Sequence, residues 1–359
     1  MKRPYRLVQV GTGGMGQRWC ETFLPPHVEA GNLEVVGAVD VNPDALFKTR
    51  HHLGLDEEEC FTDASEAFSE LDADCCTVVV PPEFHEDIVD AAVTHDLHIL
   101  SEKPIADSLE ASVRIAEKVE AAGLKMGVTM SHRFRDDITT LRRRIRSPDS
   151  GPVDYVVGRL LCSYREHGAW GGGTFRHEME HPLLVDGAVH HLDLLADMAG
   201  GTCDRLYAES WLPAWGAFAD DGQALVTMHF DNGTRVTYEG ALTNASALNC
   251  WGDEYIRAEC RDATLVLSEH ELERHGFEID TAGEGQGDSI AMDTQKFWAH
   301  EWLIEQFVHW LDGADAMATN VQDNLQSMAL VETAIQSGNT GEPLNPQTVL
   351  ADAKCAVDV

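Results

Sequence analysis

Residues 6–24, RLVQVGTGGMGQRWCETFL, decide the fold of this chain. Arg6 to Val10 is a short apolar run that predicts a buried strand, and Met15 to Leu24 predicts a helix that stops at Pro25-Pro26. Between them, Gly11 to Gly16 has the spacing G-x-G-x-x-G. A strand, a glycine-rich turn and a helix in this order are the context in which that spacing holds a dinucleotide.

The three glycines of this spacing have distinct expected roles. Gly11 permits the tight turn, Gly13 lets a pyrophosphate approach the backbone, and Gly16 allows the helix to pack closely on the strand. The amino end of the helix would face the phosphate charge. We expect the dinucleotide to contact Gly11, Thr12, Gly13, Gly14, Met15 and Gly16. The alternative is a glycine-rich turn that holds no ligand.

The segments that follow continue to alternate between strand and helix patterns. Strands are expected at residues 33–39, 75–80, 97–100 and 124–130, and helices at residues 43–53, 65–71, 83–95 and 107 to about 123. This alternation predicts an α/β fold with a doubly wound parallel sheet of the Rossmann type. We therefore expect a first domain over residues 1–130.

The second half of the chain has a different pattern. Strands are expected at residues 153–162, 205–212, 224–230, 235–240 and 263–268, and helices at residues 141–145, 297–312 and 321–336. Asp231-Asn-Gly233 is a strong hairpin signal between two of these strands. We expect an α+β domain with an open, largely antiparallel sheet over residues 131–359. Whether its C-terminal segment packs back on the first domain is left open.

The composition excludes several classes of protein. The chain has 61 acidic and 26 basic residues and a formal charge of −35, which repels nucleic acid and anionic lipid. No stretch approaches the roughly 18 apolar residues that span a bilayer, and no export signal is visible, so we expect a cytoplasmic protein with no membrane partner. The nine cysteines lack any C-x-x-C pattern, so neither a disulfide framework nor a zinc site is expected.

The acidic residues are dispersed through the chain, a pattern that is typical of proteins from salt-loving organisms. At about 1 M salt the Debye length is about 3 Å, which screens the repulsion between these charges. We therefore expect folding to need high salt. The alternative is an ordinary acidic protein from a mesophile.

Asp40 lies at the end of the second predicted strand, 24 positions after Gly16. A carboxylate there can accept hydrogen bonds from both hydroxyls of the adenosine ribose and repels a 2′-phosphate. Asp40 therefore favours NAD over NADP as the cofactor. The alternative is that Asp40 caps the helix that begins at Pro43.

Two further groups of polar residues suggest chemistry. Glu102-Lys103-Pro104 follows the fifth predicted strand, at the edge of the sheet where open α/β sheets bind ligands, although Lys103 could equally be a surface charge. Asp186 and His190 are four residues apart in a predicted helix over residues 184–198, so they share one face, and Asp193 continues that face. His191 points elsewhere and is expected to be structural or at the surface. A histidine on a helix is more often structural until a carboxylate partner and a cofactor site accompany it.

With these residues in place, the chain resembles the Gfo/Idh/MocA oxidoreductases over nearly its whole length. The resemblance rests on the glycine turn, Val80-Pro-Pro-Glu-Phe-His85, Glu102-Lys103-Pro104, His132-Arg133-Phe134, Gly171-Gly-Gly173 and Asp186-Gly-Ala-Val-His190-His-Leu-Asp193. The motifs are specific together, although each alone is not. The chain departs from the family pattern at Pro82, where Asn is common, and at Ala188, where Gly is common, and these departures put the substrate in doubt more than the fold.

The resemblance implies a Rossmann domain and a second α/β domain whose sheet forms the interface of a homo-oligomer, a dimer or a tetramer. It implies a catalytic trio of Lys103, Asp186 and His190, no metal, and a cis peptide before Pro104. It places the cofactor also at Pro81, His85, Glu102 and Lys103. The substrate is expected to contact Lys103, Arg133, Tyr164, Trp170, Arg176, Asp186 and His190, because hydroxyl-rich ligands need fork-like donors and flat apolar faces.

We therefore expect an NAD-dependent dehydrogenase of a sugar, sugar acid or cyclitol. His190 would take the hydroxyl proton, Lys103 would stabilise the developing alkoxide, and Asp186 would orient the substrate and the histidine. One alternative is a redox-neutral enzyme that modifies sugars through a transient oxidation and regenerates NAD in each cycle. Another is a non-catalytic regulator that keeps the fold and the cofactor.

Overall fold

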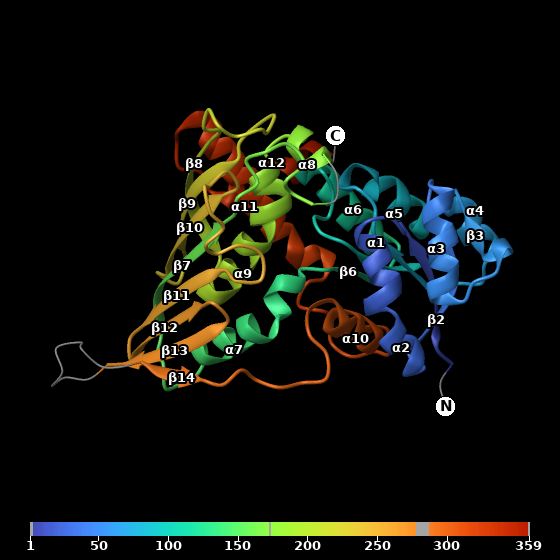
Figure 1. The fold of residues 1–359 in the computed structure, drawn as a ribbon, viewed down its shortest axis with the longest axis horizontal. Coiled ribbons are helices and arrows are strands. Elements are labelled where there is room, and N and C mark those ends of the chain that lie inside the picture. Colours follow the sequence, from blue (N-terminus) through green and yellow to red (C-terminus); the bar gives the residue numbers. More distant parts are fainter. Residues whose placement is uncertain (1–2, 172–173, 278–286, 358–359) are drawn as a thin grey trace. The chain divides into compact units, whose positions relative to one another are not determined.

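The computed structural model describes residues 3–171, 174–277 and 287–357. These residues form two compact units (Figure 1). The first unit consists of residues 1–131, 297–328 and 353–359, and the second of residues 132–296 and 329–352. Gly172 and Gly173 of the motif that begins at Gly171 lie outside the described residues.

The first unit contains a six-stranded, wholly parallel sheet in the order β3-β2-β1-β4-β5-β6. Its strands are β1 (Tyr5–Val10), β2 (Leu33–Val39), β3 (Cys60–Phe61), β4 (Cys75–Val78), β5 (His98–Ser101) and β6 (Met126–Val128). The predicted doubly wound sheet is confirmed. The strands are almost wholly buried and apolar, as expected where helices cover both faces of a parallel sheet.

The strand order reverses between β1 and β4, which lie side by side although about 65 residues separate them in the chain. Ligands of such sheets bind outside the carboxyl ends of the strands at this switch point. The glycine turn follows β1 and the segment that contains Pro81 follows β4. The topology therefore brings these two segments to the same edge of the sheet.

The helices of the first unit include α1 (Met15–Arg18), a π-helical segment (Trp19–Phe23), α2 (Pro25–Glu29), α3 (Pro43–Leu53), α4 (Ala64–Glu70), α5 (His85–Thr94), α6 (Leu109–Ala121) and α10 (Ala299–Leu311). The prediction that a helix stops at Pro25-Pro26 is confirmed, because the helical run that begins at Met15 ends at Phe23. The sequence did not predict that the two prolines are the first residues of a new helix, α2. Proline is tolerated in the first turn of a helix, where its missing N–H has no intrahelical partner to lose.

The second unit contains an eight-stranded sheet in the order β14-β13-β12-β11-β7-β10-β9-β8. Its strands are β7 (Val153–Leu161), β8 (Cys203–Trp211), β9 (Gln223–Phe230), β10 (Arg235–Ala241), β11 (Tyr255–Cys260), β12 (Ala263–Ser268), β13 (Glu271–Gly276) and β14 (Asp288–Ile290). All adjacent pairs are antiparallel except β7 and β10. The predicted hairpin at Asp231–Gly233 joins β9 to β10, with Gly233 at a φ of 92°.

Helices cover one face of this sheet (Figure 1). They include α7 (Asp136–Ile145) and α9 (Val189–Ala199), which begins directly after a π-helical segment (Leu183–Ala188). The short helix α8 (Phe175–Glu178) precedes that segment in the chain. The contact between α9 and the sheet is close, since a Cβ at Gly158 of β7 would lie 2.8 Å from Leu195. Two further helices, α11 (Val321–Thr340) and α12 (Pro346–Val357), contribute residues to both units.

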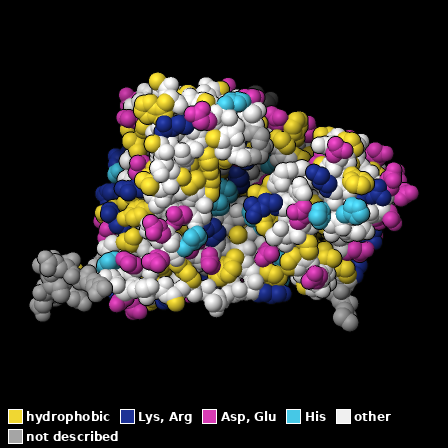
Figure 2. All heavy atoms as spheres, viewed as in Figure 1, with side chains coloured by type: hydrophobic (Ala, Val, Ile, Leu, Met, Phe, Trp, Pro, Cys, Tyr) yellow, Lys and Arg dark blue, Asp and Glu magenta, His cyan; other side chains and the backbone are white. Residues whose placement is uncertain are grey.

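The described residues contain no helix both long enough and apolar enough to cross a bilayer. Acidic side chains are scattered over the face of the molecule in Figure 2, in both units. This dispersal agrees with the pattern of acidic residues in the sequence.

Candidate functional site

The glycine turn of the first unit needs glycine at two positions for packing. At Gly11, where φ is +85°, a Cβ would lie 2.0 Å from the carbonyl oxygen of Val79 after β4. At Gly16, a Cβ would lie 2.1 Å from the carbonyl oxygen of Gly11. Side chains at these positions would push β1, β4 and α1 apart.

The middle of the turn is open. A Cβ at Gly13 would meet only an oxygen of Asp40, at 3.9 Å, and a Cβ at Gly14 would meet nothing within 4 Å. Gly13, Gly14 and Met15 are exposed, and Met15 begins α1. A pyrophosphate could therefore lie directly against the backbone, so these residues fit a dinucleotide.

Asp40 follows β2 and binds the glycine turn. Its Oδ2 accepts hydrogen bonds from the backbone N–H groups of Thr12 (2.7 Å) and Gly13 (3.0 Å) and from the Thr12 hydroxyl (3.1 Å). The residue that caps α3 is Asn42, whose side chain accepts from the N–H of Asp44. Asp40 thus holds the turn in shape, a role that the sequence did not predict.

Glu102, after β5, is a buried carboxylate with three donors. Its Oε1 accepts hydrogen bonds from Trp19 Nε1 (2.9 Å) and His300 Nε2 (3.0 Å), and its Oε2 faces the backbone N–H of Lys103 at 3.3 Å. Burial acts to raise the pKa of Glu102, but His300, Trp19 and the charge of Lys103 outweigh it and hold this pKa at about 2. The next peptide, Lys103–Pro104, is cis, as the resemblance implies.

The partners of Glu102 come from distant parts of the chain. Trp19 lies in the π-helical segment after the glycine turn, and His300 lies in α10, 198 residues after Glu102. Phe23 stacks on His300 with a centroid separation of 4.4 Å and an interplanar angle of 4°. The carboxylate next to Lys103 is therefore tied to the helix that follows the glycine turn.

His85 is fully buried at the start of α5, next to the segment that contains Pro81. Its ring nitrogens lie 2.9 Å from the carbonyl oxygen of Val80 and 3.1 Å from that of Ile105. Burial lowers the pKa of His85, and a neutral ring donates only one of these two hydrogen bonds. The ring thus links the segment after β4 to the segment that contains Lys103.

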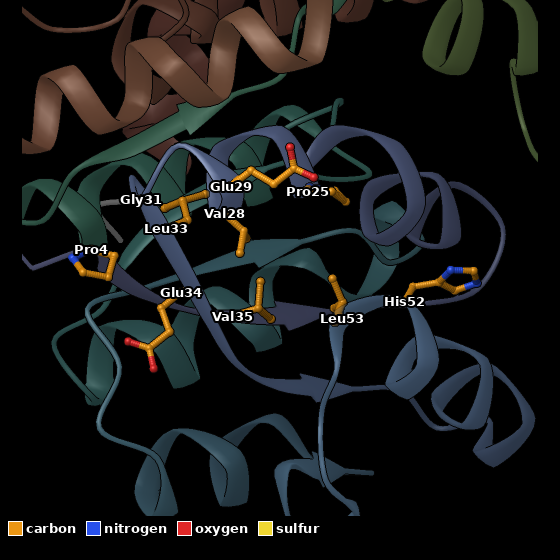
Figure 3. A pocket seen from close by; sticks show the side chains of 10 residues that line it. All are labelled: Pro4, Pro25, Val28, Glu29, Gly31, Leu33, Glu34, Val35, His52 and Leu53. Carbon is orange, nitrogen blue, oxygen red and sulfur yellow. The ribbon is translucent and has the colours of Figure 1, made fainter.

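A separate pocket of the first unit lies between α2, β2 and α3 (Figure 3). Its apolar lining includes Pro25, Val28, Val35 and Leu53. It shares no residue with the predicted cofactor-binding set.

The predicted helix over residues 184–198 is confirmed as a helical run, but its first part is π-helical: Asp186 lies in the π-helical segment and His190 lies in α9. The wider π turn changes the angle between successive side chains. The Asp186 carboxylate accepts a hydrogen bond from Arg176 Nε at 2.6 Å, and its side chain is 13% exposed. The predicted catalytic carboxylate is therefore paired with a predicted substrate residue.

Aromatic rings accompany this ion pair. The Arg176 guanidinium lies 5.1 Å from the centroid of the Trp170 ring and donates to the carbonyl oxygen of Gly171. Trp170 stacks on Tyr164 at 5.5 Å and on Trp251 at 6.0 Å. These residues give the unit a set of flat apolar faces beside a fork-like donor, as a hydroxyl-rich ligand requires.

Arg133 is engaged within the protein. Its guanidinium forms a two-pronged ion pair with Asp193 of α9, whose side chain is 1% exposed, and also lies 3.6 Å from Asp197. Arg133 therefore neutralises a buried carboxylate. A role in binding substrate would have to be shared with this ion pair.

His190 is 7% exposed and packs face to face on His132. The ring centroids are 4.1 Å apart and the planes meet at 13°. His191, the next residue, is buried, with Nδ1 3.2 Å from the Tyr238 hydroxyl and a ring centroid 5.9 Å from that of His132.

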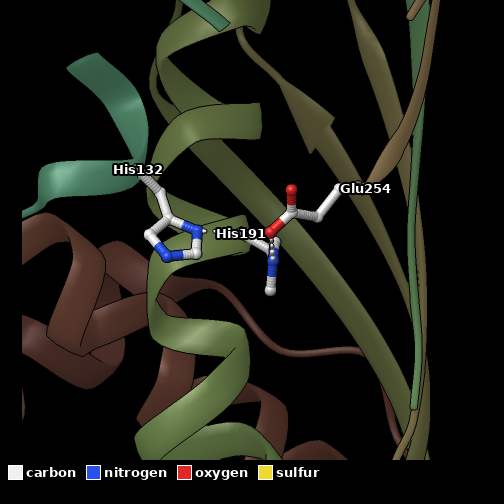
Figure 4. A group of neighbouring side chains, drawn as sticks. All are labelled: His132, His191 and Glu254. Atoms are coloured by element: carbon white, nitrogen blue, oxygen red, sulfur yellow. Dashed lines mark hydrogen bonds and ion pairs between the residues drawn. The ribbon is translucent and has the colours of Figure 1, made fainter. Parts of the chain in front are cut away.

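The side chains of His132, His191 and Glu254 converge (Figure 4). Glu254 Oε1 lies 3.3 Å from His132 Nδ1 and 3.5 Å from His191 Nε2, and the three ligand atoms lie within 4.8 Å of one another. However, the same oxygen faces the N–H of Gly252, and Oε2 binds the guanidinium of Arg135. Because a cation here would meet that guanidinium, we interpret the group as a hydrogen-bonded network.

Two models of one protein family match the two halves of the chain. Residues 5–130 match the Gfo/Idh/MocA model described as an oxidoreductase family with an NAD-binding Rossmann fold, and residues 151–345 match its C-terminal α/β domain. The chain belongs to the Gfo/Idh/MocA oxidoreductase family. Its cofactor is NAD.

Several known proteins are similar to this chain over nearly their full length. Protein y4oX of Sinorhizobium fredii is 47% identical over 99% of both chains. The scyllo-inositol 2-dehydrogenase (NAD(+)) of Bacillus subtilis is 25% identical over 95% of both chains. An oxidoreductase from Agrobacterium radiobacter, solved with NAD+, L-tartaric acid and magnesium, has a TM-score of 0.81 at 16% identity, over 96% of this chain and 99% of that one.

The structure of this Gfo/Idh/MocA protein groups the predicted residues within each unit. In the first unit, Asp40 binds the glycine turn, and Glu102 precedes Lys103. In the second unit, Asp186 pairs with Arg176. Several residues that hold these groups in place could not be given a role from the sequence, namely Trp19, His132, Trp251, Glu254 and His300.

Proposed function

We propose that the chain oxidises a secondary or anomeric hydroxyl of a sugar, sugar acid or cyclitol, with NAD as the hydride acceptor. The observation that carries the proposal is the arrangement in the second unit, where the Asp186–Arg176 pair lies among stacked aromatic rings and His190 follows on α9. Similarity to the Bacillus subtilis scyllo-inositol 2-dehydrogenase over nearly the whole chain supports a cyclitol or related polyol.

Lys103 has the role of stabilising negative charge on the substrate oxygen. NAD, when bound, supplies the nicotinamide ring that accepts the hydride. The substrate oxygen becomes alkoxide-like as its carbon gives up hydride, and an ammonium group beside it lowers the energy of that state. Glu102 holds the backbone of Lys103 through the contact with its N–H group.

His190 takes the hydroxyl proton as the carbon loses hydride. Asp186 orients the substrate, and Arg176 holds the Asp186 carboxylate through Nε, so the orientation of this carboxylate is fixed. Tyr164 and Trp170 offer flat faces for the apolar C–H groups of a polyol ring. No step of this scheme needs a metal ion.

Replacement of Lys103 by alanine tests the proposal. We expect turnover to fall by at least about 100-fold while NAD binding changes little, because the lost interaction forms mainly in the transition state. Lys48→Ala, which removes an exposed lysine of α3, is the matched control and should leave turnover unchanged. Near-normal turnover in the Lys103→Ala protein would contradict the assignment.

We also propose how the protein is organised and where it works. Residues 1–130 bind NAD, and residues 131–359 bind substrate and form a homo-oligomer, a dimer or tetramer, through the open sheet. The charge of −35 supports a cytoplasm with high salt. Sedimentation in molar KCl tests the assembly, and a monomer at micromolar concentration would contradict it.

A further inference from the structure

We infer that His132 is a positioning residue for His190, and that Glu254 anchors it in that role. The inference rests on the proposed function of His190 as the group that takes the substrate proton. It adds to that function a second imidazole and a buried carboxylate, both in the second unit.

The stacking geometry restricts the ring of His190. The rings of His132 and His190 are nearly parallel, at 13°, with a centroid separation of 4.1 Å. If the His190 ring rotated about its Cβ–Cγ bond, one of its edges would be driven into the face of His132, which would break the contact. The stack thus selects one plane for His190, and a general base must keep its lone pair aligned with the proton that it takes.

His132 is itself held from two directions. Glu254 Oε1 lies 3.3 Å from its Nδ1, and the Trp251 ring meets it edge-on at 5.5 Å. Trp251 also contacts His190 edge-on at 6.4 Å and stacks on His191 at 5.6 Å. The platform beneath His190 therefore consists of side chains that restrain one another.

The carboxylate in this platform is fixed as an anion. Burial acts to raise the pKa of Glu254, but His132, His191 and Arg135 outweigh it and hold the pKa well below its usual range. Arg135 is shared with Asp137, so two buried carboxylates face one guanidinium. Asp137 also lies 3.3 Å from the exposed His270.

The side chains of His132 and Glu254 also stabilise positive charge on the ring of His190. Burial lowers the pKa of His132, which favours a neutral ring whose Nδ1 lies 3.3 Å from the Glu254 carboxylate. The face of a neutral aromatic ring attracts a cation, and the Glu254 carboxylate, 3.3 Å from His132 Nδ1, adds negative charge on the same side of His190. A proton that arrives on His190 during turnover is therefore stabilised from behind by His132 and Glu254.

Steady-state kinetics of the full chain with NAD and a polyol substrate test the inference through three variants. His132→Ala removes the stack, and we expect kcat to fall about 100-fold with KM changed less than about 3-fold. His132→Phe keeps a flat ring at the same place and should recover about 10-fold of that loss. Glu254→Gln keeps the size of the side chain but removes its charge, and should lower kcat about 10-fold.

A double-mutant cycle separates positioning from a general structural role. If His132 acts through His190, then His132→Ala adds little to the loss caused by His190→Ala. Equal kcat for the alanine and phenylalanine variants, or losses that multiply in the double variant, would overturn the inference. Full turnover by the single His190→Ala variant would instead overturn the proposed function. Should His132→Ala fail to fold, the kcat values of His132→Phe and Glu254→Gln still test the inference. Each is expected to lie about 10-fold below the kcat of the wild type, and wild-type kcat in both variants would overturn the inference.

Discussion

The buried carboxylate of Glu102 should make a measurable, pH-dependent contribution to stability. Its pKa is about 2 in the folded protein, against 4.5 for an ordinary glutamate. Because the pKa is lower in the folded state, the stabilisation is full above pH 4.5 and is lost as the pH falls from 4.5 toward 2. A difference of this size corresponds to about 3 kcal/mol, of which about 1.4 kcal/mol is lost between pH 7 and pH 3.5.

Glu102→Gln removes this titration while it keeps an oxygen for Trp19 and His300. Guanidinium unfolding at pH 7 and pH 3.5 gives the free energy of unfolding of both proteins. We expect the advantage of the wild type to shrink by about 1.4 kcal/mol at the lower pH. Glu58→Gln, at an exposed position, is the matched control and should change little. A difference in the free energy of unfolding between wild type and Glu102→Gln that stays constant over this pH range would contradict a lowered pKa of Glu102.

Two further predictions concern the glycine turn and the charge of the chain. Gly13→Ala should melt at nearly the wild-type temperature but bind NAD at least about 10-fold more weakly. Gly11→Ala should lose about 2 kcal/mol or more of the free energy of unfolding, because its Cβ would lie 2.0 Å from a carbonyl oxygen. Calorimetry and NAD titration distinguish these outcomes, and equal melting temperatures would contradict them. The melting temperature of the wild type should rise by more than about 10 °C between dilute and molar KCl, because salt screens a charge of −35. An unchanged melting curve would contradict the proposed salt requirement.

Local patterns predicted much of the fold. Residues 33–39 and 43–53 were expected as a strand and a helix and have those bounds as β2 and α3. The first is a run of buried β-branched residues, and the second begins with proline after an asparagine cap. Such signals depend only on residues that are close together in the chain, so the sequence alone is enough to predict these elements.

Other elements were missed because their local patterns are weak. The strands β11 and β13, YIRAEC and ELERHG, carry charged residues at every second position or more often. They are strands because both neighbours in the sheet supply backbone partners. The π-helical segment before α9 was also missed, because apolar spacing does not distinguish it from an α-helix.

The support around the candidate site could not be predicted for a different reason. Glu102 and His300 are 198 residues apart, and His132 and Glu254 are 122 residues apart. Only the tertiary fold brings these pairs together. The sequence thus identified motif residues such as Lys103, but not the side chains that orient them.

Hydride transfer from a polyol to NAD can be measured by a spectrophotometric screen in molar KCl. The purified protein is offered NAD or NADP with a panel of aldoses, uronic acids, amino sugars and inositols, and absorbance of the reduced cofactor is followed. We predict NADH formation with at least one polyol and little NADPH with any. Tight NAD binding without formation of reduced cofactor would contradict this prediction. Consumption of a substrate would then indicate a redox-neutral enzyme. If no substrate were consumed, the result would indicate a non-catalytic regulator.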